Sequence, residues 1–387
     1  APHPVQGGQA PIGKPREDFR HDDGGGCKSR AKPYSGAMQR VTLTSIADLA
    51  SLPFDEVIDV RSPAEFAEDH VPGAINLPVL DDDERARVGI VYVQQSRFLA
   101  RRMGAALVAR NAAEHLEGTL ADRPSDYRPL VYCWRGGQRS GSFALILGQI
   151  GWRVGVIEGG WRSWRRLVQH ALYEMPVAPP LVVLDGNTGT AKTAILQRVA
   201  ALGGQVIDLE GLARHRGSLF GLVPGDRQPA QKAFESSLAL ALARLDPKRP
   251  VLVEAESNRI GTLRLPPMLW QAMRAALRIE IAAPLPARAE WLVRAYADIT
   301  ADGAELAARI ESLSPYQPRA VLREWQALAS EGEFVALAGR LMQEHYDPRY
   351  ARTKLRAERA PVAEFAAETM DEAGLDALAR HIAAWLG

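Results

Sequence analysis

The stretch that decides the fold reads Leu130-Val131-Tyr132-Cys133-Trp134-Arg135-Gly136-Gly137-Gln138-Arg139-Ser140. A short apolar run, typical of a buried strand, ends in Cys133; a loop with two adjacent glycines follows, and helical patterning begins near Ser140. The N–H groups of such a loop and the N-terminus of the helix point at the sulfur, which lowers the pKa of the thiol. The pattern therefore predicts that Cys133 is a nucleophile at the end of a strand.

Cys133 and Arg139 form a C-x5-R motif. The residues between them can curl around a tetrahedral anion, to which the arginine adds a bidentate contact. A buried structural cysteine is the alternative interpretation, but two glycines and two arginines are poor core material. We therefore predict an anion cradle made by Trp134, Arg135, Gly136, Gly137, Gln138 and Arg139.

A second anion-binding loop is predicted after the apolar run 181–184. Its residues are Gly186, Asn187, Thr188, Gly189, Thr190, Ala191, Lys192 and Thr193. In such a loop, between a strand and a helix, the N–H groups and the lysine bind phosphates and the threonine can hold magnesium. Ala191 breaks the G-x4-G-K-[ST] pattern, because alanine tolerates a positive φ poorly. We expect phosphate or diphosphate binding rather than ATP hydrolysis; an ordinary strand-to-helix turn is the alternative.

Polar residues after two other predicted strands suggest a second site. Glu254 and Glu256 follow the apolar run 251–253, where a carboxylate can hold a metal through water or activate a nucleophile. A solvated strand end is the alternative for these two. His215 and Arg216 lie in a glycine-flanked polar segment, in the place where α/β proteins bind ligands. No His/Cys spacing indicates zinc, so we expect no metal bound by the protein alone.

Tryptophan and arginine alternate at 161–166, and a basic run occupies 349–356. Arginine neutralises phosphates and aromatic rings stack on bases, which suggests contacts with a nucleic acid. A solvated helix face with core tryptophans is the alternative. The candidate contact residues are Arg162, Arg165, Arg166, Arg349, Arg352 and Lys354.

The composition limits the class of protein. Lys plus Arg is 47 and Asp plus Glu is 46, so contacts with a nucleic acid would come from local patches. A hydrophobic share of 47% and a charged share of 24% are typical of a globular protein. Two cysteines in 387 residues argue against a disulfide scaffold and for a reducing compartment. With no apolar stretch long enough for a bilayer, we expect a cytoplasmic protein without membrane contact.

Strands that alternate with helices predict two parallel α/β sheets. We expect strands at 56–60, 154–157, 181–184, 206–209 and 251–253, helices at 83–117 and 140–150, and mostly helix from about 287 onward. Ser62 is the predicted N-cap of a further helix, with Glu65 three residues on. The predicted organisation is a disordered tail or extension at 1–37, a first domain at 38–172, a linker at 173–180, a second α/β domain at 181–290 and a mainly helical region at 291–387.

The first domain resembles the rhodanese family. The resemblance rests on 59–66, 70–76, the cysteine loop and Glu158-Gly159-Gly160, in that order. In that family the cysteine carries sulfur as a persulfide. The common sulfurtransferase loop is C-x4-R, whereas the longer C-x5-R loop is similar to those of related phosphatases and arsenate reductases. The extra residue implies a phosphate-sized cradle, which fits a phosphorylated chalcogen donor better than thiosulfate.

The chain as a whole resembles the tRNA 2-selenouridine synthase family. The motifs that carry this resemblance are the cysteine loop, the loop at 186–193, and the segments 208–217 and 254–261. It implies a rhodanese-like domain followed by a P-loop NTPase-like α/β domain with a helical C-terminal part. It also implies a transferase that replaces sulfur by selenium in wobble-position 2-thiouridine of tRNA, through an S-geranyl intermediate. Ala191 departs from the usual phosphate loop.

The partners implied by this resemblance are tRNA, selenophosphate and geranyl diphosphate, with selenophosphate synthetase as a further protein partner. We expect no tightly bound cofactor and no contact with DNA, and magnesium at the second loop stays an open option. Three other functions also stay open: a rhodanese-type sulfurtransferase with a regulatory phosphate-loop module, a C-x5-R phosphatase, and a non-catalytic tRNA-binding module.

Overall fold

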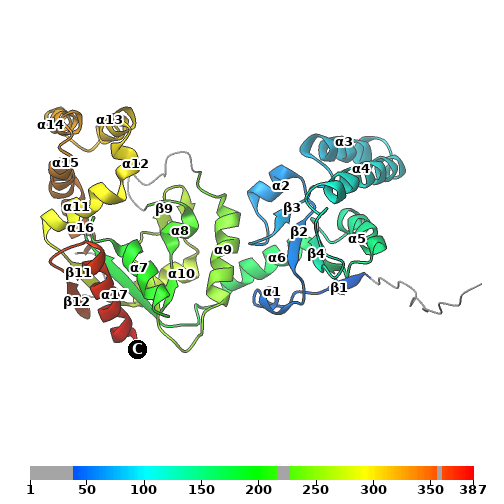
Figure 1. The fold of residues 1–387 in the computed structure, drawn as a ribbon, viewed down its shortest axis with the longest axis horizontal. Helices are drawn as coiled ribbons and strands as arrows, with labels where there is room; N and C mark the ends of the chain where they lie inside the picture. Colours follow the sequence, from blue (N-terminus) through cyan, green and yellow to red (C-terminus); the bar gives the residue numbers. More distant parts are fainter. Residues whose placement is uncertain (1–37, 217–226, 355–359) are drawn as a thin grey trace, which may run out of the picture. The chain divides into compact units, whose positions relative to one another are not determined.

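The structure, a computed structural model, describes residues 38–216, 227–354 and 360–387 (Figure 1). Of residues 352–354 it describes the backbone alone. The tail predicted at 1–37, which includes Cys27, lies outside the described residues.

A five-stranded sheet with all strands parallel forms the first domain, in the order β1-β5-β4-β2-β3. Its strands are β1 (Gln39–Val41), β2 (Glu56–Asp59), β3 (Ile75–Asn76), β4 (Pro129–Tyr132) and β5 (Gly155–Ile157). The helices that accompany it are α1 (Asp48–Ser51), α2 (Pro63–Glu68), α3 (Asp82–Gln94), α4 (Arg97–Glu117), α5 (Gln138–Ile150), α6 (Gly160–Gln169) and the π-helical turn η1 (His170–Glu174). The predicted parallel α/β sheet is confirmed.

Helices cover both faces of this first sheet. Because side chains alternate along a strand, Leu130 and Tyr132 of β4 pack with Trp161 and Trp164 of α6. Val131 and the adjoining Cys133 pack on the opposite face, among residues of α4 and α5. Burial on both faces explains why β4 is apolar throughout rather than alternating.

The second domain contains another five-stranded parallel sheet, in the order β12-β11-β6-β8-β7. Its strands are β6 (Leu181–Gly186), β7 (Gln205–Ile207), β8 (Val251–Glu254), β11 (Leu277–Ala282) and β12 (Ala363–Ala366). A separate antiparallel pair consists of β9 (Arg259–Ile260) and β10 (Leu263–Arg264). The accompanying helices are α7 (Lys192–Ala201), α8 (Leu209–Ala213), α9 (Gln231–Ala243), α10 (Pro267–Ala275), α11 (Leu285–Ala295) and α17 (Glu372–Leu386).

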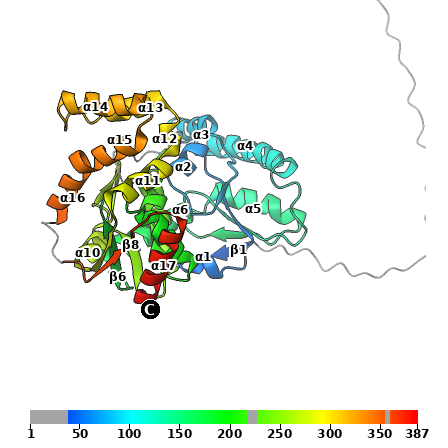
Figure 2. The same cartoon turned by 60° about the vertical axis from the view of Figure 1, so that its left-hand side comes forward.

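The second sheet is also covered on both faces. Leu181 and Val183 of β6 pack with residues of α9 and α10, whereas Val182 and Leu184 pack with residues of α7 and α17. The helix α17 packs against α7 and β12, and Figure 2 shows it, in red, over the second sheet. The loop predicted to bind phosphate therefore begins at the carboxyl end of β6, a central strand of the sheet.

Between β11 and β12 the chain forms a group of helices. They are α12 (Ala297–Thr300), α13 (Gly303–Glu311), α14 (Arg319–Ser330), α15 (Phe334–Leu341), the π-helical turn η2 (Met342–Tyr346) and α16 (Asp347–Lys354). These helices have a core of their own, built around Trp325 and Ile310. The chain then returns to the second sheet as β12, which pairs with β11 in parallel.

The boundaries of several elements differ from the sequence prediction. The helix predicted at 83–117 is two helices, because the Ser96 hydroxyl accepts hydrogen bonds from the N–H groups of Phe98 and Leu99 and so caps α4. The strand predicted at 206–209 ends at Ile207, since the Asp208 carboxylate accepts a hydrogen bond from the Gly211 N–H and caps α8. The sequence alone did not indicate β1, β9, β10, β11 or β12.

A buried ion pair lies beneath the cysteine loop. The side chains of Arg61 and Asp59 are 1% and 0% exposed, and the Arg61 Nη2 lies 2.6 Å from the Asp59 Oδ2. The same Nη2 donates a hydrogen bond to the Asp69 carbonyl, which follows α2. The Arg61 guanidinium also faces the rings of Tyr132 and Trp161, at 5.8 and 5.2 Å from their centroids. The ion pair therefore connects β2, α2, β4 and α6.

We expect Arg61→Ala to lower the free energy of unfolding by about 3–5 kcal/mol, because it leaves the Asp59 carboxylate buried without its partner. Urea unfolding followed by tryptophan fluorescence measures the change. Arg128→Ala is the matched control, because Arg128 pairs with Asp55 and their side chains are 41% and 39% exposed. We expect this variant to lower the free energy of unfolding much less. Equal effects of the two variants would contradict a structural role for the Arg61 pair.

Candidate functional site

Cys133 follows β4, and the loop after it wraps back over the start of α6. The Trp161 N–H donates a hydrogen bond of 2.8 Å to the Cys133 carbonyl. Gly136 has a φ of +64°, and a Cβ at this position would lie 2.5 Å from the Ile157 carbonyl oxygen. Gly160, with a φ of +56°, would place a Cβ 2.1 Å from the Cys133 carbonyl oxygen. Only glycine therefore allows the two backbone segments to approach this closely.

The Cys133 thiol is buried, with 4% of the residue exposed. Burial by itself raises the pKa of the thiol, but the net shift is downward. The Ser140 hydroxyl donates a hydrogen bond of 3.2 Å to the Cys133 Sγ. The backbone N–H groups of Ser140 and Arg135 and the positive charge of Arg139 also lower the pKa. The loop therefore favours the thiolate, as its sequence predicted.

Arg139 is held in place by Glu65 of α2. Its Nη1 lies 2.7 Å from the Glu65 Oε2, and Arg85 of α3 approaches the same oxygen at 3.4 Å. Burial raises the pKa of Glu65. The hydrogen bond and the charge of Arg139, with other contacts, lower it by more than this, so that the net shift is downward. Arg139 thus remains near the sulfur while a fixed negative charge balances it. Glu65 also accepts a hydrogen bond of 3.3 Å from the N–H of Ser62, the residue at the N-cap of α2.

The loop at 186–193 connects β6 to α7. Ala191 is the N-cap of α7 and has a φ of +54°, in the left-handed region that the sequence pattern assigns to glycine. The Lys192 Nζ donates a hydrogen bond of 2.9 Å to the Gly186 carbonyl and so bends back across the loop. The Thr188 carbonyl accepts a hydrogen bond from Arg288, which also pairs with Asp347. The loop therefore joins a central strand to a helix, as the sequence predicted, with Ala191 in a conformation that glycine adopts more readily.

Carboxyl groups gather beside this loop at the end of β8. Glu254 is fully buried, and burial, together with the nearby Asp208 and Glu210, raises its pKa well above the usual range. Burial and the charge of Glu210 raise the pKa of Glu256 to about 8, although Lys192 opposes the shift. The Thr193 hydroxyl donates a hydrogen bond of 2.7 Å to Glu210. These upward shifts favour the neutral forms of Glu254 and Glu256, which lessens their repulsion of an anion on the loop.

A pocket, which we call the phosphate pocket, brings several predicted residues together. Lys192, Thr193, Glu256, Arg216 and Arg349 all line it. His215 does not line it, and burial lowers the pKa of its imidazole. Arg216 pairs with Asp298 at 3.0 Å and lies over the Tyr296 ring. Glu254 lies behind the pocket, where its Oε2 accepts a hydrogen bond from the Leu209 N–H.

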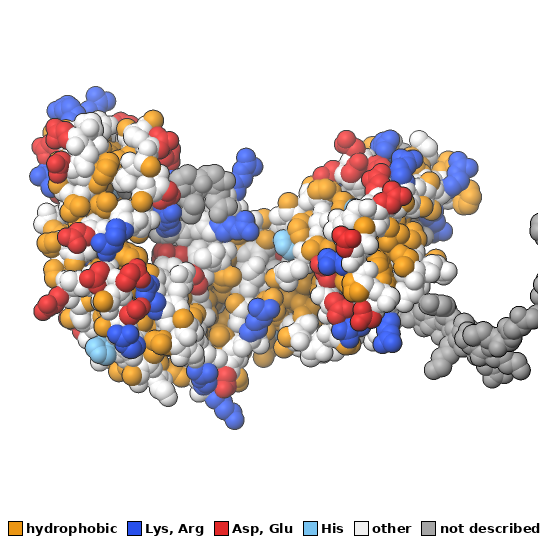
Figure 3. Space-filling model, in the orientation of Figure 1, with side chains coloured by type: hydrophobic (Ala, Val, Ile, Leu, Met, Phe, Trp, Pro, Cys, Tyr) orange, Lys and Arg blue, Asp and Glu red, His pale blue; other side chains and the backbone are white. Residues whose placement is uncertain are grey.

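The remaining basic candidates occupy different surroundings. Arg165 is mostly buried and pairs with Glu235 of α9, so its charge is already engaged within the protein. Arg162 and Arg166 are exposed on α6, whereas Trp161 and Trp164 belong to the core, as the alternative interpretation holds. The side chains of Arg352 and Lys354 lie outside the described residues. Figure 3 shows basic and acidic side chains interspersed on the face it presents, in keeping with the balanced composition.

Several residues of the two sites were not indicated by the sequence. The sequence indicates Glu65 only as part of a helix start, and it does not identify Glu210, Arg288 or Asp347 as residues of a site. Their partners lie far along the chain, so no local pattern reveals these contacts. Ser140 belongs to the cysteine motif. Its position one residue after Arg139, in the first turn of a helix, is a local sign that its hydroxyl could contact the thiol.

Within the described ranges, no group of three or more His, Cys, Asp or Glu side chains is arranged to hold a metal ion. Thr193 is the residue of the second loop whose position suits magnesium, and its hydroxyl is bonded to Glu210. None of the helices in the described part of the chain has the length and apolar character needed to cross a membrane.

A thiol in a C-x5-R loop on one parallel sheet and a phosphate-type loop on another define a rhodanese-like domain joined to a P-loop-type domain. Comparison with known families agrees with this class. Residues 44–167 match the Rhodanese-like domain, and residues 179–317 match the family described as tRNA 2-selenouridine synthase AAA domain. A crystal structure of a rhodanese-related protein from Thermoplasma volcanium covers 33% of this chain and 91% of that chain, at 21% identity and a TM-score of 0.21, too low to add to the argument.

Three curated relatives carry the name tRNA 2-selenouridine synthase. The protein of Chromohalobacter salexigens is 40% identical over 62% of this chain and 65% of its own length, so the match to it falls just short of two thirds. That of Aeromonas salmonicida is 38% identical over 67% of this chain and 69% of its own length. That of Cupriavidus pinatubonensis is 33% identical over 81% of this chain and 94% of its own length. The chain belongs to the tRNA 2-selenouridine synthase family, and the resemblance seen in the sequence is confirmed.

We expect Ser140→Ala to raise the pKa of the Cys133 thiol, because the thiolate loses its hydroxyl hydrogen bond. The rate of alkylation by iodoacetamide, measured against pH in a Cys27→Ser background, should then rise at higher pH than in the parent protein. Ser142→Ala on the same helix is the control and should leave the profile in place. An unchanged profile for Ser140→Ala would mean that the hydroxyl does not stabilise the thiolate.

Proposed function

We propose that this protein replaces sulfur by selenium in the 2-thiouridine of tRNA, through an S-geranyl intermediate. The observation that carries the proposal is the Cys133 thiol, whose pKa is lowered inside a C-x5-R loop, in a chain that also has a phosphate-type loop. Membership of the family supports the tRNA substrate. The co-substrates in this proposal are geranyl diphosphate and selenophosphate.

The phosphate pocket is suited to the transfer of the geranyl group. The thiouridine sulfur attacks C1 of geranyl diphosphate, a C–S bond forms, the C–O bond breaks, and diphosphate leaves. Lys192 and the loop N–H groups would neutralise the charge that develops on the leaving group. A bound diphosphate would replace the Gly186 carbonyl as the partner of the Lys192 ammonium. Because the pKa values of Glu254 and Glu256 are raised, their carboxyl groups would oppose this anion less than ordinary carboxylates would.

The Cys133 loop is suited to the second stage. Geranylation makes the sulfur on the uridine ring a better leaving group, so that selenium from selenophosphate can replace it. Arg139 and the loop N–H groups would bind the phosphate part of selenophosphate. Selenium adds to C2 of the uridine ring and forms a C–Se bond, the Se–P bond breaks as water takes the phosphoryl group, and the C–S bond breaks as geranylthiol leaves. The Cys133 thiolate would guide the selenium nucleophile toward this carbon. A phosphate-sized loop around a stabilised thiolate is the geometry this stage needs.

We expect Cys133→Ser to abolish the formation of selenouridine and to leave geranylation intact. The variant, tRNA, geranyl diphosphate and selenophosphate are incubated together, and the tRNA nucleosides are measured by mass spectrometry. Cys27→Ser is the control and should form both products. Full selenation by the Cys133→Ser protein would contradict the role of this thiol.

The same assay separates the alternative functions. A rhodanese-type sulfurtransferase would turn over thiosulfate and cyanide without forming selenouridine. A C-x5-R phosphatase would hydrolyse phosphate esters, and a non-catalytic module would bind tRNA and leave its nucleosides unchanged. Any of these results with the unmodified chain would overturn the proposal.

We expect Lys192→Ala to slow geranylation by about 100-fold or more, as is typical when a charge-stabilising group is lost from a transferase site. Geranyl-tRNA formed over time, measured by mass spectrometry without selenophosphate, gives the rate. Lys248→Ala is the control, since Lys248 is exposed and lies outside the phosphate pocket. Unchanged formation of geranyl-tRNA by Lys192→Ala would exclude this loop from the geranyl step.

A further inference from the structure

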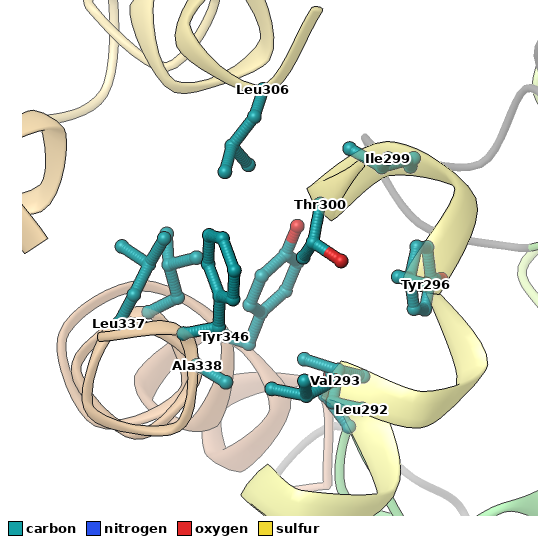
Figure 4. Close-up of a pocket in the computed structure, with 12 residues that line it drawn as sticks. Leu292, Val293, Tyr296, Ile299, Thr300, Leu306, Leu337, Ala338 and Tyr346 are labelled. Carbon is teal, nitrogen blue, oxygen red and sulfur yellow. The ribbon is translucent and has the colours of Figure 1, made fainter. Parts of the chain in front are cut away.

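An apolar pocket lies among the helices that follow α11 (Figure 4). Its walls include Leu292 of α11, Ile299 of α12, Leu306 of α13, and Leu337, Ala338 and Leu341 of α15. In Figure 4, Leu337 and Ala338 lie opposite Val293 and Thr300, with Leu306 above them. No charged side chain lines this pocket in the described part of the chain. It is therefore suited to a hydrocarbon rather than to a nucleotide base or a phosphate.

The apolar pocket adjoins the phosphate pocket. Thr188, Leu292, Tyr296 and Tyr346 line both. Thr188 belongs to the phosphate loop itself, so that loop forms one end of the apolar space. A ligand whose phosphates rest on the loop would direct the other end of the molecule toward Leu292 and the helices beyond.

Tyr346 stands at this junction with its hydroxyl group unsatisfied. The hydroxyl oxygen is buried and makes no hydrogen bond to any residue that the structure describes. Figure 4 shows the ring of Tyr346 between α15 and α12, with its hydroxyl toward Thr300. A buried hydroxyl without a partner costs free energy, and a ligand oxygen would remove this cost. This observation is independent of the apolar lining and also indicates a ligand, one with both an apolar and a polar part.

We propose that the apolar pocket binds the hydrocarbon tail of the prenyl diphosphate whose diphosphate group rests on the loop at 186–193. This inference rests on the proposed function and extends it, because it assigns the tail to the helices between β11 and β12. Burial of the tail contributes affinity through the hydrophobic effect, which the phosphate loop cannot supply. The second sheet therefore holds the head of the donor, and the inserted helices select its tail.

The size of the apolar pocket favours a short tail. Its volume is about 60 Å³, far below the several hundred Å³ of sites for drug-sized ligands. A tail enters this space only if lining side chains such as Phe334 and Leu337 move, and each further isoprene unit requires more movement. A chain of three units would need much larger movements, so the pocket should prefer a C10 tail to a C15 tail.

Equilibrium binding to the full chain tests the inference without any need for turnover. Calorimetry compares inorganic diphosphate with dimethylallyl, geranyl and farnesyl diphosphates. We expect geranyl diphosphate to bind at least about tenfold more tightly than inorganic diphosphate. Dimethylallyl diphosphate should lie between them, and farnesyl diphosphate should gain nothing over geranyl. Equal binding of geranyl and inorganic diphosphate would overturn the inference.

Two variants test whether the tail binds in this pocket. Ala338→Phe fills it and should remove the preference for geranyl over inorganic diphosphate while leaving the affinity for inorganic diphosphate unchanged. Ala336→Phe is the matched control on the same helix, since Ala336 is exposed and does not line the pocket. Phe334→Ala enlarges the pocket and should raise the ratio of farnesyl to geranyl affinity at least about tenfold.

The measurements distinguish a failure of the pocket assignment from a failure of the proposed function. If Ala338→Phe does not fold, as judged by its thermal midpoint, the ratio measured with Phe334→Ala decides. An unchanged tail preference in a folded Ala338→Phe protein, or an unchanged ratio in Phe334→Ala, would overturn the inference. Transfer of geranyl to tRNA is measured separately: tight tail binding without transfer would contradict the proposed function and leave the pocket assignment in place.

Discussion

The cysteine loop depends on a charge that solvent hardly reaches. Arg61 lies under the loop with nearly all of its surface buried, held by Asp59 and by the carbonyl of Asp69. Its guanidinium faces Trp134 and Trp161, which stack on each other with ring centroids 4.5 Å apart. Trp134, the first residue of the loop, and Trp161, at the start of α6, thus pack against the same guanidinium group. This arrangement holds the loop in the course that turns its N–H groups toward the sulfur.

The two anion loops balance their charges in different ways. At the first loop, the positive charge of Arg139 is offset by Glu65, which is ionised because its pKa is lowered. At the second loop, burial and neighbouring carboxylates raise the pKa values of Glu254 and Glu256 and so favour their neutral forms. The first loop therefore stabilises a thiolate without a large excess of positive charge. At the second loop, the raised pKa values of the two glutamates lessen the negative charge beside Lys192, which suits a ligand that arrives and leaves as an anion.

The sequence predicted the central strands well, because β4, β6 and β8 are short, mainly apolar runs buried on both faces. It did not reveal β12, whose residues Ala363-Glu364-Phe365-Ala366 favour a helix and become a strand only by pairing with β11. Both loops were recognisable because their chemistry is local. The contacts that complete the loops could not be recognised from the sequence, since Glu65 and Arg139 lie far apart along the chain, as do Arg288 and Asp347. The apolar pocket was hidden for the same reason: its residues come from the helices α11, α12, α13 and α15, the turn η2 and a loop.

The position of β12 also affects the order in which the chain can fold during synthesis. The last strand of the first sheet ends at Ile157, so that sheet can assemble while the rest of the chain is still being made. The second sheet differs, because β11 ends at Ala282 and its edge partner β12 begins at Ala363. On the ribosome, at about 5–20 residues per second, β11 would stay exposed at that edge for some seconds. The inserted helices are made in this interval, and their own core around Trp325 allows them to fold before the edge of the sheet is covered.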